Sequence, residues 1–295
     1  MSRVAVTGAS GLLGRHVVRA LGGAGHDVLP LSRGGHRPHD PAGLVATDLS
    51  AGHLTDLLRG TDVVVHLAAV RGGPGTLADF AVNADLTDTV LTAAVAAGVP
   101  AAVLASSISV YSEATTRPWR EDDDAVPANA YGLSKLAAEK VGARVAAESG
   151  LRVTSLRLGH LYGPLEDNDY LVNRFFRLAL EGRPLRVTPP SDNRREMLYV
   201  EDAAQACLAA VGAGVDGPVN VPGGERRSNH EVAQDVAAGF GTGSPVEVDT
   251  ALTDTVRPTA LDGTRAREVL GYVPRWRMVD ACRQVHEVME VARED

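Results

Sequence analysis

Short apolar runs alternate with longer amphipathic segments over the first 160 or so residues of the chain. The longer segments carry apolar side chains every three or four positions, as at Leu12, Leu13, Val17 and Leu21, which is the spacing of one helix face. The short runs are rich in valine, leucine and alanine, and they predict strands at residues 4–7, 28–31, 44–46, 63–67, 102–106 and 153–158. Because parallel strands need crossovers that pack on the sheet, this alternation predicts an α/β fold with a Rossmann-type doubly wound parallel sheet.

The pattern changes after about residue 160, where prolines and glycines become frequent and strand and helix signals interleave less regularly. This change predicts a smaller C-terminal α/β lobe, packed over the carboxyl edge of the sheet. We expect residues 1–160 to form the larger domain, with the chain returning to it around residues 195–220. Residues 161–194 and 221–295 are expected to form the smaller lobe.

The composition is that of an ordinary globular protein, with 44% hydrophobic residues, 22% charged residues and a net charge of −8. An acidic chain without a basic stripe is a poor candidate for binding nucleic acid or an anionic membrane. No apolar run is long enough to span a bilayer, and the chain begins directly with strand-like sequence, so we expect a cytoplasmic protein. Cys207 and Cys282 lack metal-ligand spacing, and the carboxylates at 121–124 are typical of a solvated loop, so no metal site is expected.

A glycine-rich turn separates the first predicted strand from the first predicted helix. Gly8 suits a tight turn, Gly11 lets the backbone approach a pyrophosphate, and Gly14 lets helix and strand pack closely. The unpaired amides and partial positive charge at the start of the helix favour phosphate. The position of this turn therefore predicts a dinucleotide site in the larger domain, formed here by Gly8, Ser10, Gly11, Leu12, Leu13 and Gly14.

The end of the second predicted strand indicates which dinucleotide binds. An acidic residue there accepts hydrogen bonds from the ribose of NAD, whereas the 2′-phosphate of NADP needs a cation. Ser32 and Arg33 stand at this point with no acidic residue before Asp40, which favours NADP. NAD stays an alternative, because Arg33 also fits a solvated loop charge. Asp48 is placed to accept from the adenine amino group, and the other residues expected along the cofactor are Leu49, Leu67, Ala68, Ala69 and Leu158.

Tyr131 and Lys135 lie four positions apart, on one face of a predicted helix. A phenol is a poor acid–base catalyst at neutral pH, but an adjacent ammonium and an oxidised nicotinamide stabilise its phenolate. The fifth predicted strand delivers hydroxyl groups, among them those of Ser107 and Ser109, to the same edge of the sheet. These residues together predict a catalytic site beside the cofactor.

With these pieces assembled, the chain resembles an extended short-chain dehydrogenase/reductase of the NAD-dependent epimerase/dehydratase family. The resemblance runs from the glycine turn to residues 270–274, so it covers nearly the whole chain. Its other matching pieces are Asn83 and the segments 156–164, 195–202 and 220–221.

The resemblance implies a role for each catalytic residue. Tyr131 would be the acid–base residue, Lys135 would hold the nicotinamide ribose, and Ser107 would orient the carbonyl or alkoxide. The substrate implied is a nucleotide-diphosphate sugar held by the C-terminal lobe. The residues implied to contact it are Ser107, Ser109, His160, Arg195 and Arg257.

The chain also departs from the family pattern. His160 stands where members usually carry Asn before the Tyr-Gly-Pro element, which affects the usual contact to the substrate diphosphate. The segment 71–75 is short and glycine-rich, so the pocket wall is expected to be reshaped. Sugar-nucleotide 4,6-dehydratases carry an Asp-Glu pair after the catalytic Thr, whereas Ile108 and Ser109 stand in that place here. Elimination of water is therefore disfavoured.

The residues leave three functions open. The first is NADPH-dependent reduction of a keto group on a nucleotide sugar or a related keto compound, and the second is NAD-dependent 4-epimerisation of a nucleotide sugar. The third is a non-catalytic dinucleotide-sensing protein, which the retained Tyr131 and Lys135 disfavour. The resemblance further implies a homodimer that forms through the helix carrying Tyr131 and its neighbour near 83–98.

Overall fold

Seven parallel strands form the large sheet in the part of the chain that the computed structural model describes, which is residues 1–34, 39–71, 75–112, 117–166, 168–188, 192–249, 251 and 256–294. Their order across the sheet is β10-β6-β5-β4-β1-β2-β3, wound outward in both directions from β1 and β4. The strands are β1 (Arg3–Thr7), β2 (Asp27–Ser32), β3 (Val45–Ala46), β4 (Val63–His66), β5 (Ala101–Ser107), β6 (Arg152–Leu158) and β10 (Gly217–Val221). Each boundary predicted for the first six strands lies within one residue of the observed boundary.

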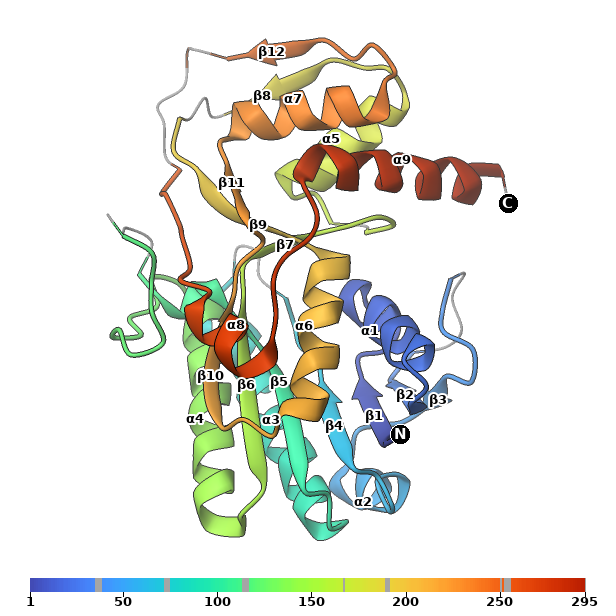
Figure 1. Ribbon diagram of the computed structural model, residues 1–295, viewed down its shortest axis with the longest axis vertical. Helices are drawn as coiled ribbons and strands as arrows, with labels where there is room; N and C mark the ends of the chain where they lie inside the picture. The colour runs from blue at the N-terminus through green and yellow to red at the C-terminus, as the bar shows by residue number, and fades with distance from the viewer. Residues whose placement is uncertain are drawn as a thin grey trace.

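Helices cover both faces of this sheet (Figure 1). On one face lie α1 (Leu12–Gly23) and α6 (Val200–Ala213), and on the other lie α2 (Ala51–Leu57), α3 (Leu77–Ala96) and α4 (Ala130–Ser149). Alternate strand residues point to opposite faces, so Val4 and Val6 share a core with α1 and α6 while Ala5 packs with the other helices. The prediction of a doubly wound Rossmann-type α/β fold is confirmed.

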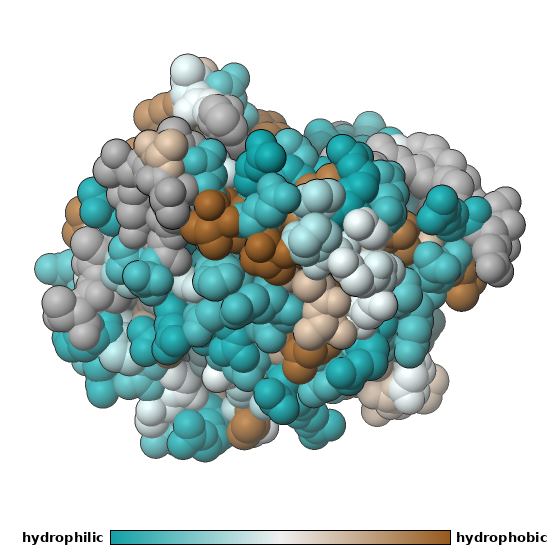
Figure 2. All heavy atoms as spheres, turned by 90° about the horizontal axis from the view of Figure 1, so that it is seen from above, coloured by the Kyte–Doolittle hydropathy of each residue, from teal (hydrophilic) through white to brown (hydrophobic). Residues whose placement is uncertain are grey.

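A smaller layer lies above the carboxyl edge of the large sheet (Figure 1). It contains a three-stranded sheet of β7 (His160–Tyr162), β9 (Arg195–Tyr199) and β11 (Glu225–Arg227), and a pair of β8 (Leu185–Val187) with β12 (Val246–Val248). Its helices are α5 (Leu171–Leu180), α7 (Asn229–Phe240) and α9 (Met278–Glu294). Seen from above, this layer presents a mostly hydrophilic face on which apolar residues form small separate groups (Figure 2).

One helix of the C-terminal segment lies outside this smaller layer. The short α8 (Thr264–Leu270) contacts α6 and β10, so it sits beside the large sheet although its residues fall inside the predicted smaller lobe. The predicted domain boundaries otherwise stay a prediction. Within the described ranges, no helix combines the length and the apolar character that crossing a membrane requires.

The edge where the parallel strands end positions the functional residues. Loops that follow β1, β2, β4, β5 and β6 meet the smaller layer around a cavity of about 980 Å³. Open α/β sheets bind ligands at this edge, in the crevice outside the carboxyl ends of the strands. The side chains that line the cavity are therefore the candidates for chemistry.

Candidate active site

Two glycines of the glycine turn are required by close backbone packing, Gly8 against the loop after β4 and Gly14 against the turn itself. Gly8 has a φ of +71°, and a Cβ atom there would lie 2.7 Å from the amide nitrogen of Ala68. A Cβ atom at Gly14 would overlap the carbonyl oxygen of Gly8. Gly11 is the N-cap of α1, it lines the cavity, and no side chain caps this helix. The first amides of α1 thus have no helical partner at a point that borders the cavity, which fits a pyrophosphate group.

The end of β2 lies beside this turn. The Oγ atoms of Ser10 and Ser32 are 2.7 Å apart, and Arg33 lines the cavity next to them. The other predicted cofactor residues that border the same cavity are Leu12, Leu13, Leu49, Leu67, Ala68, Ala69 and Leu158. A dinucleotide therefore fits the residues that the structure brings together here.

Asp48 is the predicted cofactor residue that the structure does not bring to the cavity. Its Oδ1 accepts a hydrogen bond from the Ser50 amide at 2.9 Å and lies 3.3 Å from Nδ1 of His53. The hydrogen bond from Ser50 lowers the pKa of this carboxyl. Asp48 thus contacts residues at the start of α2, next to Leu49, which lines the cavity, and its predicted contact with adenine stays a prediction.

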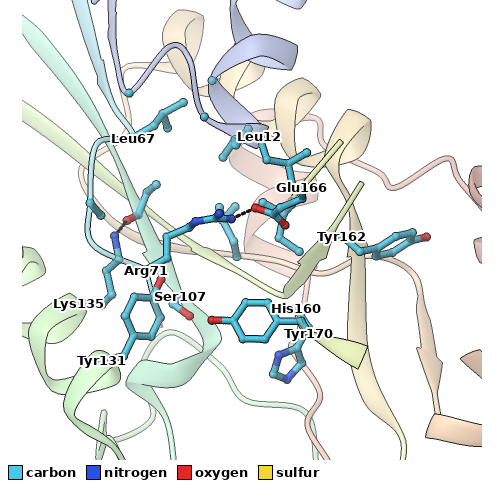
Figure 3. Close-up of a pocket in the computed structure, with 18 of the residues that line it drawn as sticks. Leu12, Leu67, Arg71, Ser107, Tyr131, Lys135, His160, Tyr162, Glu166 and Tyr170 are labelled. Carbon is cyan, nitrogen blue, oxygen red and sulfur yellow. Dashed lines mark hydrogen bonds and ion pairs between the residues drawn. The ribbon is translucent and has the colours of Figure 1, made fainter. Parts of the chain in front are cut away.

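The catalytic residues predicted from the sequence converge at the end of β5. Ser107 is the last residue of β5, and its hydroxyl oxygen accepts a hydrogen bond from the Ser109 amide at 3.1 Å. Tyr131 lies in the first turn of α4, and its hydroxyl points toward the same part of the cavity as that of Ser107 (Figure 3). Lys135 follows one turn later and donates from Nζ to the carbonyl oxygen of Ala105 at 2.9 Å. All three residues line the cavity, together with Ser109.

Gly132 explains how α4 comes so near to this strand end. A Cβ atom at this position would overlap the carbonyl oxygen of Ser109 and would lie 3.1 Å from Cβ of Pro127. The side chain of Asn129, the N-cap of α4, accepts a hydrogen bond from the Gly132 amide at 2.8 Å. The cap and the missing side chain together set the position of Tyr131 next to Ser107.

Burial dominates the protonation of Tyr131 and Lys135. It raises the pKa of Tyr131 to about 12, with Tyr170 adding to the rise and with Arg71 and the nearby Ser107 side chain opposing it. Burial also lowers the pKa of Lys135 to about 8, an effect that Glu139 opposes. In the protein alone, the phenol of Tyr131 is therefore protonated at neutral pH.

A buried polar network supports the end of β5 from behind. Arg157 on β6 donates to both carboxylate oxygens of Glu139, at 3.0 and 2.8 Å, and Ser106 donates to the same carboxylate at 2.5 Å. Arg157 also donates to the hydroxyl of Tyr111 at 2.7 Å, and that hydroxyl donates to Asn220 on β10 at 2.8 Å. The network ties α4 to β5, β6, β10 and the segment that carries Tyr111, so it holds α4 against the sheet.

Asn83 fixes the loop that follows β4. Its side-chain oxygen accepts from the amide of Val70 at 2.7 Å, and its amide nitrogen donates to the carbonyl of Val70 at 2.9 Å. The same nitrogen donates to Oγ of Ser134 on α4 at 3.1 Å. Asn83 thus connects the loop after β4 to α4. Its position in a predicted helix did not indicate this role.

The smaller layer contributes His160 and Arg195 to the far end of the cavity. Arg195 donates from Nη2 to Oδ1 of Asn229 at 2.8 Å, whereas its buried Nε and the buried Nε2 of His160 have no hydrogen-bond partner among the described residues. Burial lowers the pKa of His160 to about 3, so the imidazole is neutral. Arg257, the remaining predicted substrate residue, is exposed and does not border the cavity.

Three residues at the centre of the cavity were not predicted as site residues. Arg71 follows β4 and forms an ion pair with Glu166, which follows β7 (Figure 3). The hydroxyl groups of Tyr131, Ser107 and Tyr170 point into the same part of the cavity (Figure 3). Arg71 lies five residues after His66, and Glu166 lies two residues after the Tyr-Gly-Pro element. These sequence positions were the only indication that the two residues border the site.

Known proteins resemble the chain over nearly all of its length. The model of the NAD dependent epimerase/dehydratase family matches residues 4–221. The dTDP-glucose 4,6-dehydratase of Streptomyces griseus is 31% identical, over 93% of this chain and 90% of its own length. The solved UDP-N-acetylglucosamine 4-epimerase from Bacillus cereus has a TM-score of 0.88 at 33% identity, covering 98% of this chain and 99% of that chain. The protein MoeE5 has been solved with NAD and either UDP-glucuronic acid or UDP-glucose, and it matches with a TM-score of 0.87 and 29% identity over 98–99% of this chain and 99% of its own.

These matches confirm the resemblance drawn from the sequence and the prediction of an enzyme. The family model alone spans the glycine turn, the predicted catalytic residues Tyr131 and Lys135, and the returning strand β10. The chain belongs to the NAD-dependent epimerase/dehydratase family and is an extended short-chain dehydrogenase/reductase enzyme.

Proposed function

We propose that the protein is an NADPH-dependent reductase of a keto group on a nucleotide-diphosphate sugar or a related keto compound. The observation that carries this proposal is the wall of the cofactor site at the end of β2. Ser32 and Arg33 border the cavity there, and the sequence contains no acidic residue between Val28 and His39. A hydroxyl and a guanidinium suit the 2′-phosphate of NADP, and a carboxylate that would repel it is missing from this stretch.

The catalytic residues support the direction of reduction. The bound nicotinamide supplies the hydride, and the chain has to orient the carbonyl and deliver a proton. Tyr131, protonated at neutral pH, donates its proton to the carbonyl oxygen, which Ser107 holds by a hydrogen bond. Lys135 holds the ribose of the nicotinamide nucleotide. In this scheme the cavity needs no further acid.

The substrate end of the cavity supports an anionic nucleotide group. Arg195 and His160 line it with buried nitrogen atoms that have no partner among the described residues, and Ser109 borders the same space. Buried donors of this kind are costly unless a ligand pairs with them. We assign Arg195 to the diphosphate, while Arg257 is left out because it lies outside the cavity.

The cofactor proposal predicts an effect of Arg33→Ala. Loss of the guanidinium is expected to raise the Kd for NADP⁺ about tenfold, because one charge-assisted contact to the 2′-phosphate is lost. The Kd for NAD⁺, which has no such phosphate, should change less than about twofold. Calorimetric titration of both dinucleotides checks this, with Arg59→Ala, at an exposed position just after α2, as the control. Equal weakening of both dinucleotides, or tighter binding of NAD⁺ by the unmodified protein, would contradict the NADP assignment.

A 4-epimerase is the second candidate, because the solved epimerase from Bacillus cereus matches the whole chain and MoeE5 holds NAD. An epimerase keeps its dinucleotide bound and returns the hydride to the substrate. Tightly bound NAD that copurifies with the protein, with turnover of a nucleotide sugar and no net change in absorbance at 340 nm, would favour it. Stoichiometric consumption of NADPH favours the reductase.

We also propose a homodimer that forms through α3 and α4. These helices pack against each other, and they carry exposed apolar side chains, which are Leu77, Val82 and Val95 on α3 and Leu133 on α4. Contact with a second copy would bury this apolar surface. Light scattering after gel filtration should give a mass twice that of the chain, and a monomer mass would contradict the proposal.

A further inference from the structure

The ion pair between Arg71 and Glu166 crosses the cavity beside the catalytic residues (Figure 3). Arg71 belongs to the loop after β4, which borders the cofactor site, and Glu166 belongs to the loop after β7 in the smaller layer. Arg71 is near enough to Tyr131 to lower its pKa. Because the reacting carbon of the substrate has to lie against Tyr131, the pair borders the space of the sugar ring.

The side chain of Glu166 is buried and is held in place by neighbouring residues at this site. Only 5% of its side chain is exposed, compared with 52% for Arg71. Asn173 on α5 donates to its other carboxylate oxygen at 3.1 Å, and the carbonyl of the preceding Leu165 accepts a hydrogen bond from Arg15 at 3.2 Å. A buried carboxylate that faces a ligand cavity and is held on both oxygens has a fixed position, and its negative charge is compensated by Arg71.

We infer that Arg71 and Glu166 make the sugar end of the cavity selective for an uncharged hexose ring and against a uronate. This inference rests on the proposed function, and it concerns the class of sugar rather than the reaction. The hydroxyl groups of a neutral sugar can donate to Glu166 and accept from Arg71 without breaking the pair.

Binding of a sugar carboxylate is unfavourable at both positions that it could take beside this ion pair. Next to Glu166 it would be repelled by a like charge in a partly desolvated space. On Arg71 it would displace Glu166, whose buried charge would then lose its cationic partner. Arg195 does not relieve either problem, because the proposed diphosphate contact occupies it.

The test compares two sugars that share one nucleotide, so that any preference for the nucleotide cancels. UDP-glucose and UDP-glucuronic acid are titrated calorimetrically into the protein saturated with the dinucleotide that it binds best. The unmodified protein should bind UDP-glucose at least about tenfold more tightly than UDP-glucuronic acid. Glu166→Gln keeps the shape and removes the charge, so it should shift the ratio of the two Kd values about tenfold toward the uronate.

Arg71→Gln provides a second variant at a more exposed position. It removes the only described cation paired with Glu166 and leaves that negative charge uncompensated, so the ratio of the two Kd values should move further against the uronate. Glu181→Gln, which removes the charge from an exposed ion pair with Arg183, is the matched control and should leave the ratio unchanged. If the ion pair only held the two loops together, Glu166→Gln and Arg71→Gln would each weaken the binding of both sugars by the same factor.

The outcomes separate the inference from the proposed function. Binding of both sugars with equal affinity by the unmodified protein, or an unchanged ratio in Glu166→Gln, would overturn the inference and leave the nucleotide-sugar function standing. Failure of the dinucleotide-bound protein to bind either sugar would overturn both.

Discussion

Tyr131→Phe is expected to lower kcat for carbonyl reduction by roughly a thousandfold, because the proton donor is removed while the ring stays in place. The ring packs edge-on against Phe80 at a centroid distance of 5.8 Å, and phenylalanine retains this contact. The Kd for the dinucleotide should therefore change little. Stopped-flow absorbance at 340 nm, with dinucleotide affinity measured separately, checks both expectations.

Tyr272→Phe is the matched control for this substitution. Tyr272 is a buried tyrosine outside the cavity, and its hydroxyl donates to the carbonyl oxygen of Pro222 at 2.8 Å. The same loss of one hydroxyl should cost some stability there and leave kcat unchanged. If Tyr131→Phe retained most of its activity, the assignment of Tyr131 as the proton donor would be wrong.

The sequence was most informative where local chemistry decides the structure. Buried strands such as 63–66 need apolar residues on both faces. The apolar runs in the sequence therefore predicted the ends of these strands to within one residue. The turn at Gly8 and Gly14 tolerates no side chain, and this requirement is visible in the sequence as glycine. Tyr131 and Lys135 share a helix face by their spacing alone.

The sequence could not predict contacts that only the tertiary fold creates. Arg71 and Glu166 are separated by 95 positions, and each side chain alone has the composition of a loop charge. Their meeting depends on how the smaller layer sits over the sheet edge. Asp48 shows a related limit, since a carboxylate after a strand end can face a ligand or accept from nearby backbone. Here it accepts from the amide of Ser50, the N-cap of α2, and its contact with adenine stays a prediction.

Gly132→Ala is expected to be strongly damaging, although Gly132 itself carries no chemistry. The new Cβ atom would overlap the backbone carbonyl group of Ser109, so no side-chain rotation relieves the clash. The first turn of α4 must then move away from Ser107. We expect a loss of about 3 kcal/mol in the free energy of unfolding and a fall in kcat of about a hundredfold, because Tyr131 loses its position. Denaturant unfolding and steady-state kinetics measure the two effects.

Gly212→Ala is the control, because it makes the same change inside helix α6 with no atom within 4 Å of the new Cβ. Alanine stabilises a helix over glycine by up to about 1 kcal/mol, so this variant should be slightly more stable and fully active. A Gly132→Ala protein that unfolds at the normal denaturant concentration and keeps its kcat would show that α4 can shift without loss. In that case the close approach of α4 to the end of β5 would not be what positions the catalytic phenol.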